Sequence, residues 1–238
     1  MNKFTPYSVS KIQTYLQCPK RFEFCYIIKQ PIVQSFYHLE KGLLWHSLIE
    51  HKLSNTINNF NKPNFKELSQ KQYLFELSNC IKFIKSEFFN KYLNSQYNQI
   101  TEQYFCIDNN FNCYFDKSKK DILFRGYIDL IQYNNIYAEV IDWKTGGKSL
   151  TKIKKYPKDN FQLDVYAYVI NSICNIDNII GKYVFVEHKY EQTKQSFNFS
   201  NIKEYIIEII NKIENIEKFE RKESILCDWC DYRGWCLT

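Results

Sequence analysis

The sequence predicts an α/β protein, and three observations support this class. At 238 residues the chain is long enough to bury a substantial core and suits one mixed domain. Helical patterns fill its first part and strand patterns follow in the middle, after which helices and strands alternate. No internal repeat and no linker interrupts this order, so residues 1–238 are expected to form a single domain.

The composition favours a protein that stays inside the cell. No run of 18 apolar residues suggests a membrane span, and the N-terminus lacks the apolar core of a signal peptide. We therefore expect a cytoplasmic protein without a membrane partner, in which the nine cysteines stay reduced rather than form disulfides. The net charge of +6 suits a polyanionic partner.

Short helices are expected at the start of the chain. Either Ser8 or Ser10 can cap a first helix, and Ser10 has a glutamine at the capping-box spacing. The pair Cys18-Pro19 is expected to end or kink this helix. The helical pattern resumes from Lys20 to Ile28, where aromatic residues are frequent.

Two longer helices follow. The first is expected over Phe36 to Leu53, and a polar connection over residues 54–64 separates it from the second. The second is expected as one amphipathic helix from about Phe65 to Leu93. Its apolar face is expected to consist of Leu74, Leu77, Ile81, Ile84 and Phe88.

The remaining strands and helices are expected in this order: strands over residues 102–107, 112–115, 124–130 and 138–146, a helix over 160–173, strands over 182–187 and 195–199, and a helix over 201–219. The two central runs, 124–130 and 138–146, are rich in β-branched and aromatic residues. The turn signal Asn134-Asn135 between them predicts a β-hairpin or two adjacent strands. A lysine-rich loop is expected over residues 146–157.

Each central run carries one acidic residue in an apolar setting, Asp129 in the first and Asp142 in the second. Carboxylates are seldom buried unless they are paired or bind a metal. Residues i and i+2 of a strand share a face, so Lys144 is expected beside Asp142. Each charge alone is more often a surface or salt-bridged one, but together on adjacent apolar strands they indicate a site. Glu102 is interpreted as an exposed strand carboxylate rather than as a further site residue.

A divalent metal balances two carboxylates better than one lysine does. Carboxylates with one imidazole and water suit Mg²⁺ or Mn²⁺ rather than zinc. Such an ion binds a phosphate oxygen and activates water for attack on phosphorus. Lys144 would then orient that water or stabilise the developing charge. His46, which shares a helix face with Glu50, is the natural third ligand, although a lone helical histidine is more often structural.

Three further residues are candidates for binding substrate. Gln162 and Tyr166 lie four residues apart on one helix, where the alternative is a solvated and a core-edge residue. Lys148 belongs to the lysine-rich run after the second central strand. That run is either a solvated loop or a track for a phosphate backbone.

The C-terminal pattern Cys227-x2-Cys230-x5-Cys236 indicates a metal site, because its spacing lets thiolates turn onto one metal. Four thiolates are usual for a structural zinc or an iron–sulfur cluster, so a fourth ligand must come from elsewhere. Cys18, at the expected helix break, is the best placed, and Cys25 is the next candidate. The alternative is that the three C-terminal cysteines are small apolar residues of a packed tail.

At this point the motifs resemble those of RecB-like nucleases in the PD-(D/E)XK superfamily. The matching residues, in order, are Gly42-x3-His46-x3-Glu50, Gly126-x2-Asp129, Asp142-x-Lys144-Thr145-Gly146 and Gln162-x3-Tyr166. The opening from Ser8 to Phe22 is similar to the start of that group, so the resemblance covers nearly the whole chain. Nothing resembles the phosphate-binding loop of a helicase. We therefore expect a free-standing nuclease or a subunit.

The resemblance implies a fold and a set of roles. The fold is a central mixed β-sheet flanked by helices, as in restriction endonucleases. The implied metal ligands are His46, Asp129, Asp142 and the Trp143 backbone carbonyl. Lys144 is the implied catalytic lysine, while Gln162 and Tyr166 support the site and contact DNA.

The resemblance also implies a [4Fe–4S] cluster. Iron–sulfur members of the group include the AddB nuclease domain and the CRISPR-associated RecB-like exonucleases. They hold the cluster with one N-terminal cysteine and three C-terminal ones, which match Cys18 with Cys227, Cys230 and Cys236. The cluster would join the two chain ends through segments at about 8–30 and 220–238. Zinc stays open as the alternative metal.

Taken together, these observations predict a DNA nuclease that depends on a divalent metal. We expect an exonuclease on single strands or DNA ends, with endonuclease activity as a further possibility, in DNA repair, recombination or CRISPR adaptation. A helicase or a recombination or adaptation protein is a candidate partner. The alternative is a nucleic-acid-binding subunit that keeps the fold without cleaving, against which the intact Asp142-x-Lys144 pair argues.

Overall fold

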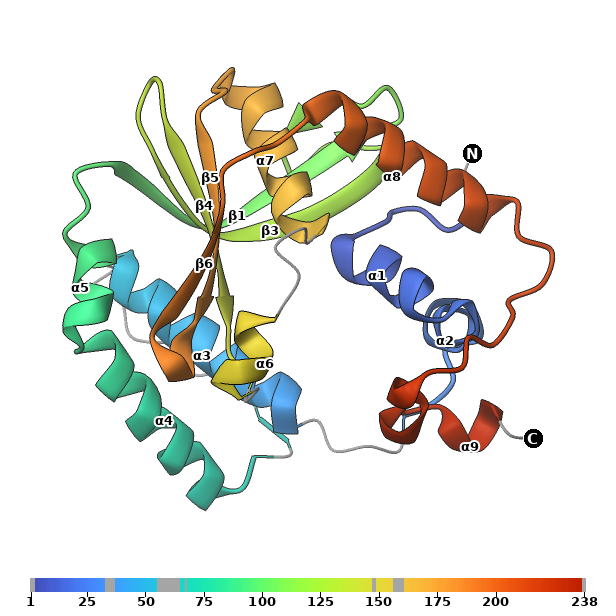
Figure 1. Ribbon diagram of the computed structural model, residues 1–238, viewed down its shortest axis with the longest axis horizontal. Coiled ribbons are helices and arrows are strands. Elements are labelled where there is room, and N and C mark those ends of the chain that lie inside the picture. The colour runs from blue at the N-terminus through green and yellow to red at the C-terminus, as the bar shows by residue number, and fades with distance from the viewer. Residues whose placement is uncertain are drawn as a thin grey trace.

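A computed structural model describes the protein over residues 3–32, 37–54, 65–66, 68–146, 149–155 and 161–236 (Figure 1). Within these residues a six-stranded sheet has the order β2-β1-β3-β4-β5-β6. β4 and β5 are parallel and the other neighbours are antiparallel, so the sheet is mixed and the predicted α/β class is confirmed. The strands are β1 (Asn98–Asp108), β2 (Cys113–Tyr114), β3 (Ile122–Tyr133), β4 (Ala138–Lys144), β5 (Ile179–Phe185) and β6 (Tyr190–Lys194).

The first helices form where the sequence predicts them. α1 (Val9–Gln17) begins at Ser8, whose side chain accepts a hydrogen bond from the Lys11 backbone N–H. Cys18 ends α1 and also precedes α2 (Pro19–Phe22), in which the proline occupies the first helical position. A π-helix, η1 (Glu23–Ile28), continues the segment. The break at the Cys18-Pro19 pair leaves the cysteine thiol at a junction between two helices.

The helix predicted from Phe65 to Leu93 is two helices. α4 (Gln70–Ile84) follows α3 (Tyr37–Leu53), and α5 (Glu87–Leu93) begins after Ser86. Ser86 interrupts the helix because its hydroxyl accepts a hydrogen bond from the Phe89 backbone N–H, as an N-cap does.

The predicted apolar face of this segment is right for Leu77, Ile84 and Phe88, which pack against a buried core, and wrong for Leu74. Leu74 is 54% exposed, whereas Glu76, Cys80 and Phe83 are buried. The buried glutamate is tolerated because the Tyr37 hydroxyl and the indole N–H of Trp45 both donate hydrogen bonds to it. A polar network between α3 and α4 therefore rotates the helix away from the orientation that hydrophobicity alone favours.

The second half alternates helix and strand. α7 (Phe161–Cys174) connects β4 to β5, as a crossover between parallel strands requires. The strand expected over residues 195–199 instead spans Tyr190–Lys194, because a left-handed turn at Lys189 starts a hairpin there. The remaining elements are α6 (Leu150–Lys154), within the lysine-rich segment expected as a loop, η2 (Val186–His188), α8 (Phe199–Glu214), η3 (Ile225–Trp229) and α9 (Arg233–Cys236).

Two apolar cores lie on opposite faces of the sheet. Residues of α1, α7 and α8 form one core with sheet residues such as Phe105 and Ile128. Residues of α3, α4 and α5 form the other with Leu130, Ile141 and Trp143. Figure 1 shows α7 and α8 on one side of the sheet and α3, α4 and α5 on the other. No helix in the described parts of the chain is both long and apolar enough to cross a membrane.

Candidate active site

The candidate site lies where β3 and β4 part. Their pairing runs from Tyr133 opposite Ala138 to Leu130 opposite Ile141. Beyond that point a segment around Tyr7 takes up β3 instead, through backbone hydrogen bonds to Leu123 and Arg125 on both sides of an isolated bridge. The two strands therefore open a gap within the sheet directly after the last pair, and the residues that come next in each strand are acidic.

Asp129 and Asp142 occupy the mouth of this gap. Both side chains are largely buried, and an Asp129 carboxylate oxygen accepts a hydrogen bond from the Trp143 backbone N–H at 2.8 Å. This bond ties the Asp129 carboxylate to the segment that carries Asp142. The hairpin predicted from Asn134-Asn135 thus brings the two carboxylates to adjacent strands.

Lys144 lies beside Asp142, as the i, i+2 spacing predicts. Its ammonium is 2.7 Å from Asp142 Oδ2 and donates a hydrogen bond to Gln162 Oε1 at 2.8 Å. The Gln162 amide group donates to Asp142 Oδ1 at 2.6 Å and to the Tyr166 hydroxyl at 2.7 Å. The first two turns of α7 therefore orient both charged side chains of β4.

His46 reaches the same site from α3. Its Nε2 lies 3.1 Å from the Trp143 carbonyl oxygen, and its Nδ1 lies 3.6 Å from Asp129 Oδ2. The imidazole thus contacts both strands that border the gap. Of the residues singled out from the sequence, this brings the histidine, the two aspartates, the lysine, the glutamine and the tyrosine together, whereas Lys148 lies outside the described residues.

Glu102 also belongs to the site, contrary to its interpretation as an exposed strand carboxylate. Its Oε1 lies 3.7 Å from His46 Nδ1, and its side chain is 31% exposed. On β1 it falls between the residues that pair with Leu130 and Ile128, so it lies opposite Asp129. A positive φ of 47° interrupts the strand at this position. No sequence signal marks such an irregularity at a glutamate, so the sequence alone does not predict that Glu102 belongs to the site.

The site holds more negative charge than its two cationic side chains balance. Burial and the Asp142 carboxylate raise the pKa of Asp129 to about 7. Burial lowers the pKa of His46, but the surrounding carboxylates, Asp129 foremost, outweigh this effect and raise it to about 9. Burial and Glu102 likewise raise the pKa of Glu50. Carboxylates that resist ionisation next to one another favour a bound cation.

The donor atoms fit a divalent metal. One ligand atom each from His46, Glu102 and Asp129 lie within 4.8 Å of one another. Asp142 Oδ2 is buried, and the Lys144 ammonium lies 2.7 Å from it. Oxygen ligands with one imidazole suit Mg²⁺ or Mn²⁺.

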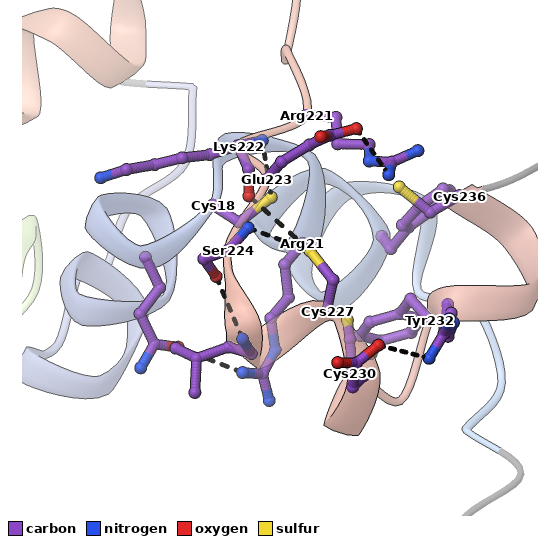
Figure 2. A pocket seen from close by; sticks show the side chains of 15 residues that line it. Cys18, Arg21, Arg221, Lys222, Glu223, Ser224, Cys227, Cys230, Tyr232 and Cys236 are labelled. Carbon is purple, nitrogen blue, oxygen red and sulfur yellow. Dashed lines mark hydrogen bonds and ion pairs between the residues drawn. The ribbon is translucent and has the colours of Figure 1, made fainter.

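A second group of potential ligands joins the two ends of the chain. Cys18, Cys227, Cys230 and Cys236 line a cavity of about 210 Å³, and Figure 2 shows their side chains around it. The Lys222 backbone N–H lies 3.5 Å from the Cys18 sulfur, and Arg21 pairs with Asp231 at 3.3 Å. Segments far apart in sequence are thereby held side by side.

The spacing of these sulfurs bears on the metal they suit. A single tetrahedral zinc with bonds of about 2.3 Å holds its sulfurs about 3.8 Å apart. Among the described cysteines, no three sulfurs all lie within 4.8 Å of one another. The residues that line the cavity do not include Cys25, the other candidate ligand, whose thiol lies beside the Tyr232 hydroxyl. Among the described residues, the four cysteines therefore line one cavity without forming a compact group of three sulfurs.

Of the comparisons with known proteins, one identifies a family. The crystal structure of SSO0001 resembles the chain with a TM-score of 0.45 and 14% identity, over 96% of this chain and 84% of that one. A search of curated proteins finds no significant match. The sequence profile of the PD-(D/E)XK nuclease superfamily matches residues 6–237. The chain therefore belongs to the PD-(D/E)XK nuclease superfamily.

Proposed function

We propose that this protein is a deoxyribonuclease that digests single strands or DNA ends as an exonuclease. It would do so by the metal-dependent phosphodiester hydrolysis that its superfamily implies. One observation carries the proposal: the side chains of His46, Asp129, Asp142 and Lys144 converge where β3 and β4 part. DNA is the proposed substrate. A helicase, or a protein of recombination or CRISPR adaptation, is the proposed partner.

Each residue has a role that its contacts suit. His46, Asp129, Asp142 and the Trp143 carbonyl would hold Mg²⁺ or Mn²⁺, and Glu102 adds a carboxylate beside His46 Nδ1, the nitrogen that Asp129 also faces. The bound cation would polarise a phosphate oxygen and lower the pKa of water.

Lys144 is the proposed catalytic lysine. Held 2.7 Å from Asp142, it places a positive charge where negative charge develops on the phosphate, and its ammonium can donate a hydrogen bond to the attacking water. Gln162 is hydrogen-bonded to both Lys144 and Asp142 and fixes their relative position. A further hydrogen bond to the Tyr166 hydroxyl orients Gln162. Burial and Asp142 keep the pKa of Tyr166 well above its usual value, so this phenol stays protonated.

We also propose that the four cysteines hold a [4Fe–4S] cluster, as in the RecB-like branch of the superfamily. The cavity that the four cysteines line, and the lack of a compact group of three sulfurs among the described residues, support a cluster over a single zinc, because each thiolate of a cluster binds a different iron. Arg21, Arg221, Lys222 and Arg233 also line the cavity. Three of them already pair with acidic side chains, Arg21 with Asp231, Arg221 with Glu223 and Arg233 with Asp228. Iron and zinc analysis of anaerobically purified protein decides between the two metals.

A cleavage assay tests the nuclease proposal. End-labelled single-stranded DNA is incubated with Mg²⁺ or Mn²⁺ and wild-type protein, Lys144→Ala or Lys182→Ala. Lys182 is a matched control because it is a half-buried lysine on the neighbouring strand, paired with Glu139 away from the gap. We expect cleavage by wild type and Lys182→Ala and none by Lys144→Ala.

Substrates with a blocked 5′ or 3′ end determine the polarity of digestion. An exonuclease that digests in one direction cleaves only one of the two blocked substrates, whereas an endonuclease cleaves both. Cleavage by Lys144→Ala at the wild-type rate would remove Lys144 from the mechanism. A wild-type protein that binds DNA without cleaving it would instead support a non-cleaving subunit.

A further inference from the structure

Beyond the carboxylates, β1 and β3 continue as a sheet face that carries aromatic side chains. Tyr104 and Tyr127 are paired across these strands, with ring centroids 5.3 Å apart in an edge-to-face arrangement. Their neighbours Phe105 and Ile128 point the other way, into the core that α7 covers. The two tyrosines therefore face away from α7. Tyr127 is 46% exposed, while Tyr104 beneath it is buried.

Cationic side chains border this tyrosine pair. The Lys117 ammonium lies 5.4 Å from the Tyr127 ring centroid and 5.8 Å from that of Tyr104. Arg125 is exposed and lies two residues before Tyr127 on the same strand face. Lys119 lies 3.9 Å from the Tyr114 ring centroid on the adjoining strand β2. An exposed aromatic ring set among cations is complementary to a nucleobase and its phosphates.

The tyrosine pair is also continuous with the candidate active site. Tyr104 and Tyr127 lie two residues along each strand from Glu102 and Asp129, which is about 6.7 Å of strand. A strand of DNA with its phosphate at the carboxylates would therefore place a neighbouring base within reach of the Tyr127 ring.

Another tyrosine pair shows that cross-strand stacking alone does not define such a surface. The rings of Tyr97 and Tyr137 lie 5.2 Å apart, a geometry that by itself stabilises a sheet. The Tyr137 hydroxyl, however, donates a hydrogen bond to Glu139, which is itself paired with Lys182. The Tyr104–Tyr127 pair differs in its cationic border, its exposed ring and its position next to the site.

We propose that Tyr127, backed by Tyr104 and flanked by Lys117 and Arg125, is a stacking platform for an unpaired base of single-stranded DNA next to the phosphate that is cleaved. The inference deepens the proposed nuclease function and rests on it for the position of that phosphate. Because duplex bases already stack on each other, the platform favours single strands over intact duplex.

Binding measured apart from cleavage tests the platform. Fluorescence anisotropy gives the Kd of a labelled oligothymidylate for Lys144→Ala protein in Mg²⁺, with and without Tyr127→Leu. We expect Tyr127→Leu to raise this Kd about tenfold, the loss of one stacked base, and Tyr127→Phe to restore most of the affinity because it keeps the ring. The control is Tyr205→Leu on α8, because Tyr205 is 43% exposed and α8 packs on the face of the sheet opposite to Tyr127.

A second variant and a second ligand sharpen the result. Lys117→Ala should weaken binding and make the dependence of log Kd on log salt shallower by about one counterion. The Kd of blunt duplex DNA for Lys144→Ala protein should be the same with and without Tyr127→Leu. A Tyr127→Leu protein that melts like its parent and binds single strands with unchanged Kd would overturn the platform, and so would a parent protein that binds no single strand.

The two proposals fail in different ways. If wild-type protein cleaves DNA but Tyr127→Leu has unchanged Kd, the platform is wrong and the nuclease function stands. If Tyr127→Leu weakens binding but wild-type protein cleaves nothing, the platform stands and the nuclease function is wrong.

Discussion

The two ligand clusters of this protein are built in opposite ways. The carboxylate site draws its two aspartates and its lysine from one hairpin in the middle of the sheet, between two apolar cores. The cysteine pocket draws on the two ends of the chain, and short helices with exposed side chains surround it. Ile225 is 85% exposed and Trp229 is 82% exposed.

This difference indicates what each cluster contributes. The packing of the sheet holds the carboxylates together against their mutual repulsion. A bound cation would reduce this repulsion. Few buried apolar residues hold the cysteine pocket, so its own ligand must contribute to keeping the chain ends together. We therefore expect changes at the first cluster to affect chemistry and changes at the second to affect stability.

The largest effect is expected for Asp142→Asn. It removes the charge that pairs with Lys144, so single-turnover cleavage should fall about 1000-fold or more, equivalent to about 4 kcal/mol of the barrier. The melting temperature should change little. Glu139→Gln, on the same strand but paired with Lys182, is the control and should cleave normally. Activity above a tenth of the wild-type rate would remove Asp142 from the mechanism.

The next largest effect is expected for Cys227→Ser. Loss of a cluster ligand should destabilise the fold by about 3 kcal/mol, which lowers the melting temperature by about 10 °C for a chain of this length. Cys174→Ser, at an exposed cysteine that ends α7, should melt like wild type. Differential scanning fluorimetry and iron analysis on the same samples check both parts. An unchanged melting temperature would show that the pocket does not hold the chain ends.

A smaller effect of opposite sign is expected for Asp129→Asn in a chelating buffer. Its folded pKa of about 7 lies above the ordinary value of 3.8, so the ionised form opposes folding. The neutral amide should raise stability by about 1–2 kcal/mol at pH 8, and the gain should shrink as pH falls below 7. Urea unfolding at pH 8 and pH 5 measures it. Destabilisation at pH 8 would contradict the view that these charges repel one another.

The last prediction concerns the pH dependence of metal binding. With a pKa of about 9, His46 carries a proton at pH 7 that a metal ligand must release. The Kd of Mn²⁺ should therefore fall by up to tenfold for each pH unit between pH 7 and 9. Calorimetry in buffers of different ionisation enthalpy counts the released proton. His46→Gln should bind more weakly with a flatter pH profile, and a parallel profile would exclude the histidine as a ligand.

Local spacing was enough to predict much of the fold and the centre of the site. The turn at Asn134-Asn135 sets β3 against β4, and alternation along β4 puts Asp142 beside Lys144. The break at Cys18-Pro19 likewise follows from the proline. Each of these depends on backbone geometry within a few residues.

Features that depend on residues far apart in the chain could not be predicted from the sequence. Glu76 of α4 is buried because Trp45 and Tyr37 of α3 donate hydrogen bonds to it, and so the predicted apolar face was only partly right. Glu102 joins the site because β1 pairs with β3 in one register and is interrupted there by a positive φ. Neither the donors nor the register can be read from the neighbouring residues.

By itself, the sequence determined the chemical groups and their local order: an acid and a lysine on one strand face, a second acid across the hairpin, and three cysteines in one short tail. Only the tertiary structure decided which distant groups meet them, namely the His46 imidazole, the Glu102 carboxylate and the Cys18 thiol. The physical reason is that side-chain alternation is a property of the local backbone. The meeting of distant segments is instead settled by how the whole chain packs its two cores.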